Sequence, residues 1–210
     1  MVDARGKTFS TSRPWAESRL FAPGRLVEPL LHGCVISSLG LVARRECWVP
    51  FDADLTWGHD WDWELRLAQE NAAHYDAEPL ACYRVHDASG TAEILSAAKN
   101  GDQERRILEA ALARLPTDGP RTRALRRSAL RSLALRHLYF AEQALLQGRT
   151  QVTRYNLRYG VRADASMALR ITTWALFFAS VAGTRWYSGF QRVRGAGLRG
   201  PRVESGMGRG

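Results

Sequence analysis

The sequence predicts a mixed α/β fold, in which a partial sheet with helices is followed by a mainly α-helical C-terminal region. A continuous apolar run at residues 33–45, rich in small and branched side chains, is typical of a buried strand, with two short strands as the alternative. A shorter run at about residues 80–85 indicates a second strand. After Ser96, apolar residues recur at the spacing of helices up to residue 183.

These patterns divide the 210-residue chain into four parts. Residues 1–30 are polar and contain turn-forming prolines, so we expect a loop with a short helix. Residues 31–95 hold the two strands and the helix between them. Residues 96–184 form a helical extension, and residues 185–210 form a basic tail rich in glycine and arginine that we expect to be disordered.

The helix between the strands is expected to begin at Asp60. Asp60 and Asp62 then lie in the first turn, where the helix dipole stabilises carboxylates. Asp62 and Arg66 are four residues apart and are expected to form an ion pair. The stretch from residue 57 to residue 69, WGHDWDWELRLAQ, is unusual for a plain core helix because it combines three tryptophans, three carboxylates and one histidine.

The extension is expected to contain several amphipathic helices. DQERRILEAALARL is one helix that ends before Pro116, and RTRALRRSALRSLALRHLYFAEQALLQG is a second that ends at Gly148. QVTRYNLRYGV begins a third. The second and third together resemble the paired helices of tetratricopeptide-type repeats, although a single hairpin does not establish a repeat array.

The net charge of the chain is +9, and its isoelectric point is near 10.2. Only Lys7 and Lys99 are lysines, so nearly all the positive charge is arginine. Such a surface attracts phosphates, nucleic acid or acidic lipid headgroups, but arginine-rich composition also follows from coding bias. No recognised nucleic-acid motif accompanies the charge, which argues against a nucleic-acid partner.

The start of the chain lacks the apolar core of a secretory signal, and the three cysteines have no metal-ligand spacing. We therefore expect Cys34, Cys47 and Cys82 to be buried thiols in a cytoplasmic protein. The apolar run at residues 171–183 is shorter than the roughly 20 residues that span a bilayer. It is expected to form a buried or interfacial helix, with peripheral contact at the inner face of the membrane.

Three blocks occur in a characteristic order: SSLGLVARR, then FDADLTWGHDWDWELRLA, then AEPLACYRVHDAS. Together they resemble the C-terminal half of the catalytic domain of family-two glycosyltransferases, which have the GT-A fold. In that family a strand with paired arginines precedes a Phe-Asp turn, an acidic pair opens a helix, and a later strand ends in Tyr-Arg-x-His. The resemblance covers about residues 30–90.

The resemblance implies inverting transfer of a sugar, a reaction that needs a base to take the proton of the acceptor hydroxyl. Asp60 matches the family's catalytic aspartate. His59, Trp61 and Trp63 would line the acceptor side, although His59 stands where the family usually has an acid. Core filling is an equal alternative for both tryptophans.

The resemblance also implies that His86 and Arg84 complete a metal or diphosphate site, with a satisfied loop histidine as the alternative for His86. Intact relatives are expected to use Mg²⁺ or Mn²⁺, a nucleotide-sugar donor and a glycan or lipid-linked acceptor. The DAD triplet at residues 52–54 looks like the family's metal signature, but it lies at the Phe-Asp turn. We therefore interpret Asp52 and Asp54 as a decoy.

Residues 1–30 offer no room for the family's nucleotide-binding half, so the chain is expected to be inactive alone. A truncated reading frame, a degenerate copy and one piece of a split enzyme all remain open. An alternative function of a different class is a helical interaction module, in which the region 100–183 binds a protein partner or an anionic membrane surface.

Overall fold

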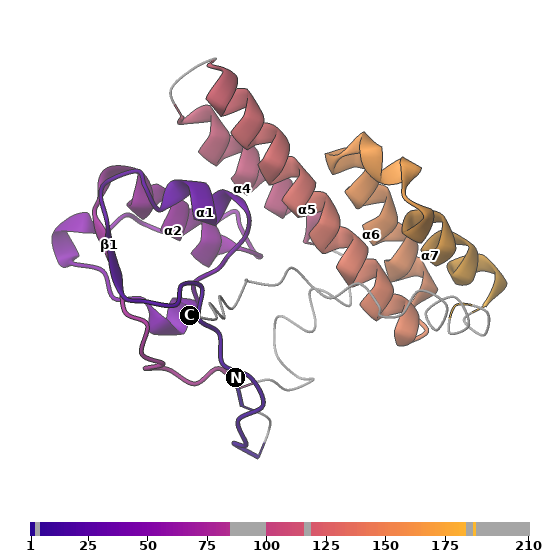
Figure 1. Ribbon diagram of the computed structural model, residues 1–210, viewed down its shortest axis with the longest axis horizontal. Coiled ribbons are helices and arrows are strands. Elements are labelled where there is room, and N and C mark those ends of the chain that lie inside the picture. The colour runs from indigo at the N-terminus through magenta and orange to yellow at the C-terminus, as the bar shows by residue number, and fades with distance from the viewer. Residues whose placement is uncertain (3–4, 85–99, 116–118, 184–186, 188–210) are drawn as a thin grey trace, which may run out of the picture.

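The computed structural model describes residues 1–2, 5–84, 100–115, 119–183 and 187. This part is mostly helical and includes one small two-stranded antiparallel sheet. Helix α5 (Pro120–Leu146) crosses the middle of the molecule, as Figure 1 shows. The N-terminal elements lie on one side of it, and α6 and α7 lie on the other.

The N-terminal elements are two short strands and two helices. Strand β1 (Arg19–Phe21) pairs antiparallel with β2 (Ala73–Tyr75), and helices α1 (Val27–Leu31) and α2 (His59–Glu70) lie between them in the chain. The indole of Trp15 packs against the rings of Phe21 and Tyr75, each at 4.9 Å between centroids. The predicted helix at Asp60 is thus confirmed, beginning one residue earlier.

The strand predicted at residues 33–45 is wrong. This segment contains two short 3₁₀ helices, η1 (Ser38–Gly40) and η2 (Arg45–Cys47), and the Val42 side chain is 97% exposed. An apolar run shows a preference for burial, but a strand also needs a neighbouring strand to satisfy its N–H and C=O groups. No strand of the described residues pairs with this segment.

The strand predicted at about residues 80–85 is also wrong over the residues described there. Residues 80–84 are exposed, and their pairing is limited to an isolated bridge between Arg84 and Val2. The sheet that does form uses residues 19–21 and 73–75, which sequence patterns did not single out. The partial GT-A-type sheet is therefore not formed by the segments from which it was predicted.

The helical extension is confirmed. It contains α4 (Gly101–Ala113), the long α5, α6 (Thr150–Ala163), η3 (Ala165–Leu169) and α7 (Ile171–Ala182). Helices α5 and α6 pack together as the predicted helix pair, and α7 packs against both. Membership of a tetratricopeptide-like repeat stays a prediction.

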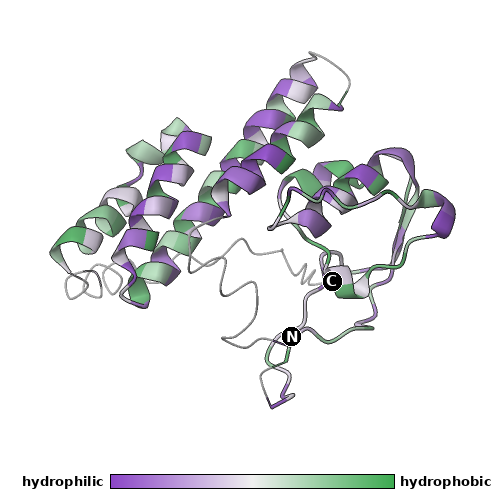
Figure 2. Ribbon diagram, turned by 180° about the vertical axis from the view of Figure 1, so that it is seen from behind, coloured by the Kyte–Doolittle hydropathy of each residue, from purple (hydrophilic) through white to green (hydrophobic). Residues whose placement is uncertain are grey.

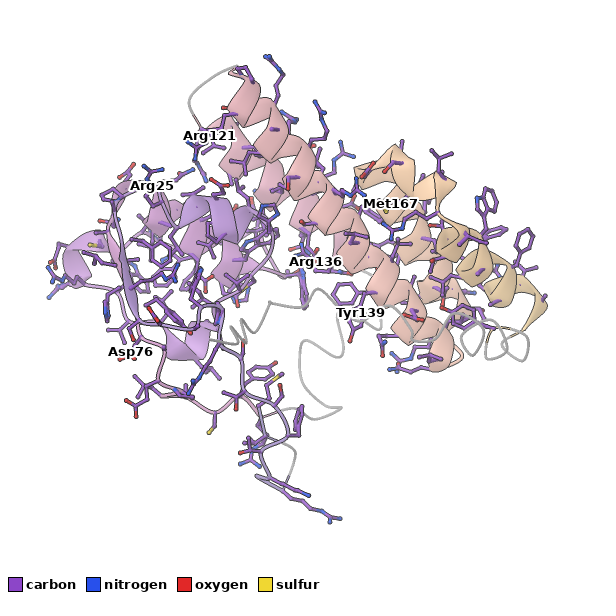
Figure 3. The ribbon with its side chains drawn as sticks, in the orientation of Figure 1. Arg25, Asp76, Arg121, Arg136, Tyr139 and Met167 are labelled. Atoms are coloured by element: carbon purple, nitrogen blue, oxygen red, sulfur yellow. The ribbon has the colours of Figure 1, made fainter. Side chains whose placement is uncertain are left out.

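Two apolar clusters hold the molecule together. The first joins α1, α2, α4 and the first part of α5, with Leu30, Leu65 and Leu108 almost fully buried. The second joins the rest of α5 to α6, η3 and α7 around Leu138 and Met167, the latter labelled in Figure 3. Because α1 lies almost entirely within residues 1–30 and belongs to the first cluster, the polar N-terminal segment contributes directly to the core.

The prediction of three buried thiols is wrong for Cys82, which is exposed, and Cys47 is only half-buried. Cys34 is exposed as a residue, but its sulfur packs against Glu64. The thiols were assigned from residue type alone, and the loops that carry them lie at the surface. In the described ranges, no helix is long and apolar enough to cross a membrane. The predictions for His86 and for most of residues 185–210 concern residues outside the part that the structure describes.

Candidate functional site

The start of α2 is shaped by a glycine. Gly58 precedes the helix with φ +69°, in the left-handed region, and a Cβ placed there would meet Ile107 Cδ1 at 2.9 Å. Glycine has no side chain that could cap the helix. The free N–H groups at the start of α2 are instead compensated electrostatically by the first-turn carboxylates, Asp60 and Asp62. This turn fixes the direction in which the acidic and aromatic residues leave the backbone.

Asp60, the predicted base, is half-buried. Its Oδ1 accepts a hydrogen bond of 2.9 Å from the backbone N–H of Trp61, which holds the carboxylate at the helix start. Glu64 lies one helical turn further on the same face. The structure thus places two carboxyl groups side by side along α2.

Glu64 is almost completely buried, with 2% of its surface exposed. Burial, with a further contribution from the charge of Asp60, raises the pKa of Glu64 to about 8. Its Oε2 lies 3.8 Å from the Cys34 Sγ, and its Oε1 has no hydrogen-bond partner among the described residues. At neutral pH, Glu64 is therefore largely protonated.

Cys34 completes this cluster. Although the residue is exposed overall, its sulfur lies against Glu64 and donates to the Ile36 carbonyl at 3.1 Å. Burial, and then the charges of Glu64 and Asp60, raise the pKa of the Cys34 thiol. The thiol is thus kept in its neutral, weakly nucleophilic form.

Trp61 and Trp63 do not line an open groove. They are 3% and 6% exposed, and their Nε1 atoms each donate a hydrogen bond of 2.7 Å, to the Leu30 and Val49 carbonyls respectively. Both indoles are therefore used within the fold, which supports the alternative of core filling. A sugar cannot stack on rings that are already covered by protein.

A different set of rings is open to solvent beside α2. Trp48 is 54% exposed, Phe51 is 45% exposed, and His59 is exposed. Trp48 and Phe51 pack on Trp63 at 5.0 and 5.2 Å between ring centroids, and Phe51 meets His59 at 5.8 Å. We call Trp48, Phe51 and His59 the aromatic platform. The exposed rings that sequence reasoning sought at residues 61 and 63 are thus supplied by their neighbours.

Both aspartates of the DAD triplet form ion pairs with an arginine. Arg106 of α4 lies 3.0 Å from Asp52 and 3.8 Å from Asp54, and Asp52 also accepts the backbone N–H of Asp54 at 2.9 Å. The described ranges contain no group of three or more His, Cys, Asp or Glu residues that could hold a metal ion. Because these carboxylates are neutralised by a guanidinium, they do not fit a divalent-cation site.

A cavity of about 430 Å³ lies where α2, α4 and the turn before α2 meet. Phe51, Asp62, Arg66 and Arg106 contribute to its lining, and Asp60 does not. The predicted pair of Asp62 and Arg66 is confirmed, with 2.8 Å between Oδ2 and Nε. Since Asp60 and Asp62 point to different sides of the helix, this cavity is separate from the Asp60–Glu64 pair.

A buried polar network ties this region to the helical extension. Glu104 of α4 accepts hydrogen bonds from Trp57 Nε1, Asn100 Nδ2 and Arg136 Nε, at 3.0, 3.1 and 3.0 Å. Burial alone would raise the pKa of Glu104, but Arg136, His137 and these hydrogen bonds lower it. Burial lowers the pKa of His137, so this imidazole stays neutral beside the charged pair.

Arg136 reaches from α5 towards α2, as its label in Figure 3 shows. Its guanidinium lies over the indole of Trp61, with 5.0 Å from the central carbon to the ring centroid. Glu104, 2.9 Å from Arg136 Nη2, is the carboxylate that balances its charge. The long helix thus fixes the indole at the first turn of α2 and, through it, the position of Asp60.

Of the remaining predicted residues, Arg84 is described and exposed, whereas His86 lies outside the described residues. Sequence reasoning missed Glu64, Trp48 and Cys34. The spacing of Asp60 and Glu64 was visible as a helical pair, but nothing in the sequence indicated that Cys34 packs against Glu64 from 30 positions earlier.

No protein-family model, no curated protein and no solved structure matches this chain. The geometry alone defines the site, which consists of an acidic pair, Asp60 and Glu64, and the exposed aromatic platform.

Proposed function

We propose that this chain supplies the acceptor side and the general base of an inverting glycosyl transfer, with Asp60 as the base. The observation that carries the proposal is a half-buried carboxyl at the start of α2 beside a buried carboxyl that is largely protonated. Asp60 is half-buried, while Glu64, one helical turn further on, has a pKa raised to about 8 by burial and by the charge of Asp60. A carboxyl group with a strongly raised pKa is a recurring feature of catalytic sites.

In this mechanism the Asp60 carboxylate takes the proton of an acceptor hydroxyl as the hydroxyl oxygen bonds to the anomeric carbon. The bond from that carbon to the nucleotide diphosphate breaks, and the diphosphate leaves with the bonding electrons. A second ionised carboxylate at Glu64 would repel the developing alkoxide. Protonation of Glu64 removes that repulsion beside Asp60, the group with partial access to solvent.

The aromatic platform supports the proposal as an acceptor-binding surface. Apolar faces of sugars stack on exposed aromatic rings, and Trp48 and Phe51 present such rings beside the start of α2. Both rings pack on the buried Trp63, which stabilises their position. In this proposal Trp61 and Trp63 hold the platform and the base in place, while Trp48, Phe51 and His59 contact the acceptor.

The nucleotide-binding half is proposed to be supplied from outside the described residues. Leu39 and Val42 are 60% and 97% exposed, and the residues flanking η1, Ser37 and Leu41, have extended backbone angles. The exposed apolar side chains of this 3₁₀-helical segment offer a surface on which such a half could pack. The divalent metal of intact relatives would, by the same reasoning, be bound with that half.

The first test is binding of acceptors by the full chain, measured by calorimetry against a panel of oligosaccharides and lipid-linked sugars. We expect at least one member to bind, and Trp48→Ala to weaken that binding about tenfold, the equivalent of one stacked ring. Leu80→Ala removes an exposed apolar side chain elsewhere and is the matched control. Equal affinity of the Trp48 and Leu80 variants would contradict the acceptor role of the platform.

The second test concerns Asp60. In a preparation with sugar-transfer activity that contains this chain, Asp60→Asn is expected to abolish turnover and to leave acceptor affinity within about threefold, because the amide keeps the shape but not the basicity. Glu64→Gln is the matched control, since it replaces a carboxyl that is already largely neutral. Normal turnover in the Asp60 variant would remove the base from the mechanism.

A further inference from the structure

Helix α7 has one buried face and one exposed apolar face. The exposed residues recur at helical spacing and carry no charge, and much of this helix is coloured as hydrophobic in Figure 2. They are Ile171, Trp174, Phe177, Phe178 and Val181, exposed by 65%, 51%, 40%, 53% and 62%. We call these five residues the α7 apolar face. The opposite face is sealed against α5 and α6.

The α7 apolar face is continuous rather than a set of isolated side chains. The rings of Trp174, Phe177 and Phe178 lie within 5.8 to 6.2 Å of one another. Leu169, at the end of η3 and two residues before α7, is a further apolar side chain and is 88% exposed. Contiguous exposed apolar surface rimmed by polar groups marks a site of interaction, in contrast to single exposed residues.

The segment that leads into and contains the α7 apolar face is basic. From residue 146 to residue 183 the chain carries five arginines and one acid, Asp164, which is a net charge of +4. None of these arginines forms an ion pair within the described part of the chain. Arg154 of α6 donates to the Ser180 carbonyl of α7 at 2.8 Å, and Arg170 is the residue directly before α7.

We propose that α7 lies in the plane of an anionic lipid bilayer, with its apolar face in the boundary between headgroups and acyl chains. Its 12 residues span about 18 Å, too short for the roughly 30 Å hydrocarbon core, so the helix lies on the membrane. Aromatic rings favour this interfacial depth, and arginines beside them attract anionic headgroups.

The positive charge near the α7 apolar face favours an anionic bilayer over a second copy of the chain as the partner. In a symmetric dimer through the α7 apolar face, two surfaces of net charge +4 would meet, and like charges at an interface oppose association. An anionic bilayer provides both complements at once, hydrocarbon for the rings and negative headgroups for the arginines. The inference does not depend on sugar transfer.

The test is flotation of the full chain with vesicles of phosphatidylcholine alone and with about 30% phosphatidylglycerol. We expect binding to the mixed vesicles, weakened about tenfold or more in phosphatidylcholine alone and weakened by added salt. Phe178→Ser with Val181→Ser is expected to reduce binding about tenfold or more, because two apolar side chains leave the bilayer. Arg158→Gln is expected to reduce it about fivefold.

Leu20→Ser with Leu80→Ser is the matched control, since these exposed apolar side chains lie outside α7 and their loss is expected to leave flotation unchanged. Circular dichroism of each variant establishes that its helices are intact. Absence of flotation by the unaltered chain would overturn the proposal, as would equal flotation of the Phe178 and Val181 double variant. A dimer that this variant converts to a monomer, without lipid binding, would assign the face to a second copy instead.

Discussion

Replacing Glu64 with glutamine tests whether this buried carboxyl is protonated in the folded chain. The pKa of Glu64 rises from 4.5 to about 8 in the folded chain. A carboxyl whose folded pKa is raised stabilises the fold in its protonated form. Its contribution is complete below the unfolded pKa and is lost as the pH rises through the folded pKa. Glutamine does not titrate, so Glu64→Gln removes this loss.

The shift corresponds to roughly 5 kcal/mol as an upper bound, at about 1.4 kcal/mol for each pKa unit. We expect Glu64→Gln and the unaltered chain to differ little near pH 5. Near pH 9 the variant is expected to be more stable by about 2–5 kcal/mol. Urea denaturation followed by tryptophan fluorescence, at several pH values between these limits, measures the difference. A difference that does not change with pH would refute the reasoning.

Glu104→Gln is expected to change the pH dependence of stability in the opposite direction, because the folded pKa of Glu104 is lowered. Its stabilising contribution is present above the unfolded pKa of 4.5 and is lost as the pH falls through the folded value. The Glu104 variant is therefore expected to be destabilised at neutral pH, with the deficit shrinking on acidification. If the stability difference from the unaltered chain changed with pH in the same direction for both variants, the two pKa shifts would not arise from the environments stated for them.

Three further substitutions address the framework of the site, each measured by the urea midpoint. Arg136→Met leaves Glu104 buried without its cation and is expected to cost about 3–5 kcal/mol; a loss below about 1 kcal/mol would contradict it. Gly58→Ala is expected to cost about 1–3 kcal/mol, because φ is +69° and Ile107 Cδ1 is 2.9 Å from the new Cβ. Gly101→Ala would place a Cβ 2.6 Å from the Tyr159 ring, so a similar loss is expected. Unchanged midpoints for either glycine variant would show that the backbone there adjusts freely.

The helices could be predicted because the information for each lies within its own segment. In α4, buried Ile107, Leu108 and Ala111 recur at the spacing of one helix face, and Pro116 marks the limit of the segment. The strands could not, because a strand depends on a partner distant in sequence. The apolar run around Val42 has the composition of a buried strand, yet that side chain is 97% exposed.

The site was predictable in position but not in detail. The acids and indoles of residues 57–64 do gather at the start of a helix, as the residue types indicated. Whether an indole faces solvent or core depends on which carbonyl takes its N–H, and those of Trp61 and Trp63 are taken by Leu30 and Val49, 31 and 14 positions away. The protonation of Glu64 likewise depends on burial that no local pattern encodes.

The two proposals constrain each other through the long helix α5. Arg136, near its middle, fixes the indole of Trp61 beside Asp60, while its later turns support α6 and α7. A base on one side of α5 and a lipid-binding face on the other belong to one packed body. If α7 lies on a bilayer, Asp60 is held near the lipid surface, because α2 and α7 are both joined to α5 in one packed body. An acceptor carried on a lipid would be concentrated in that layer, whereas a soluble glycan would not. Membrane binding by the α7 apolar face would therefore favour a lipid-linked acceptor, and a preference for soluble oligosaccharides in the presence of vesicles would separate the two proposals.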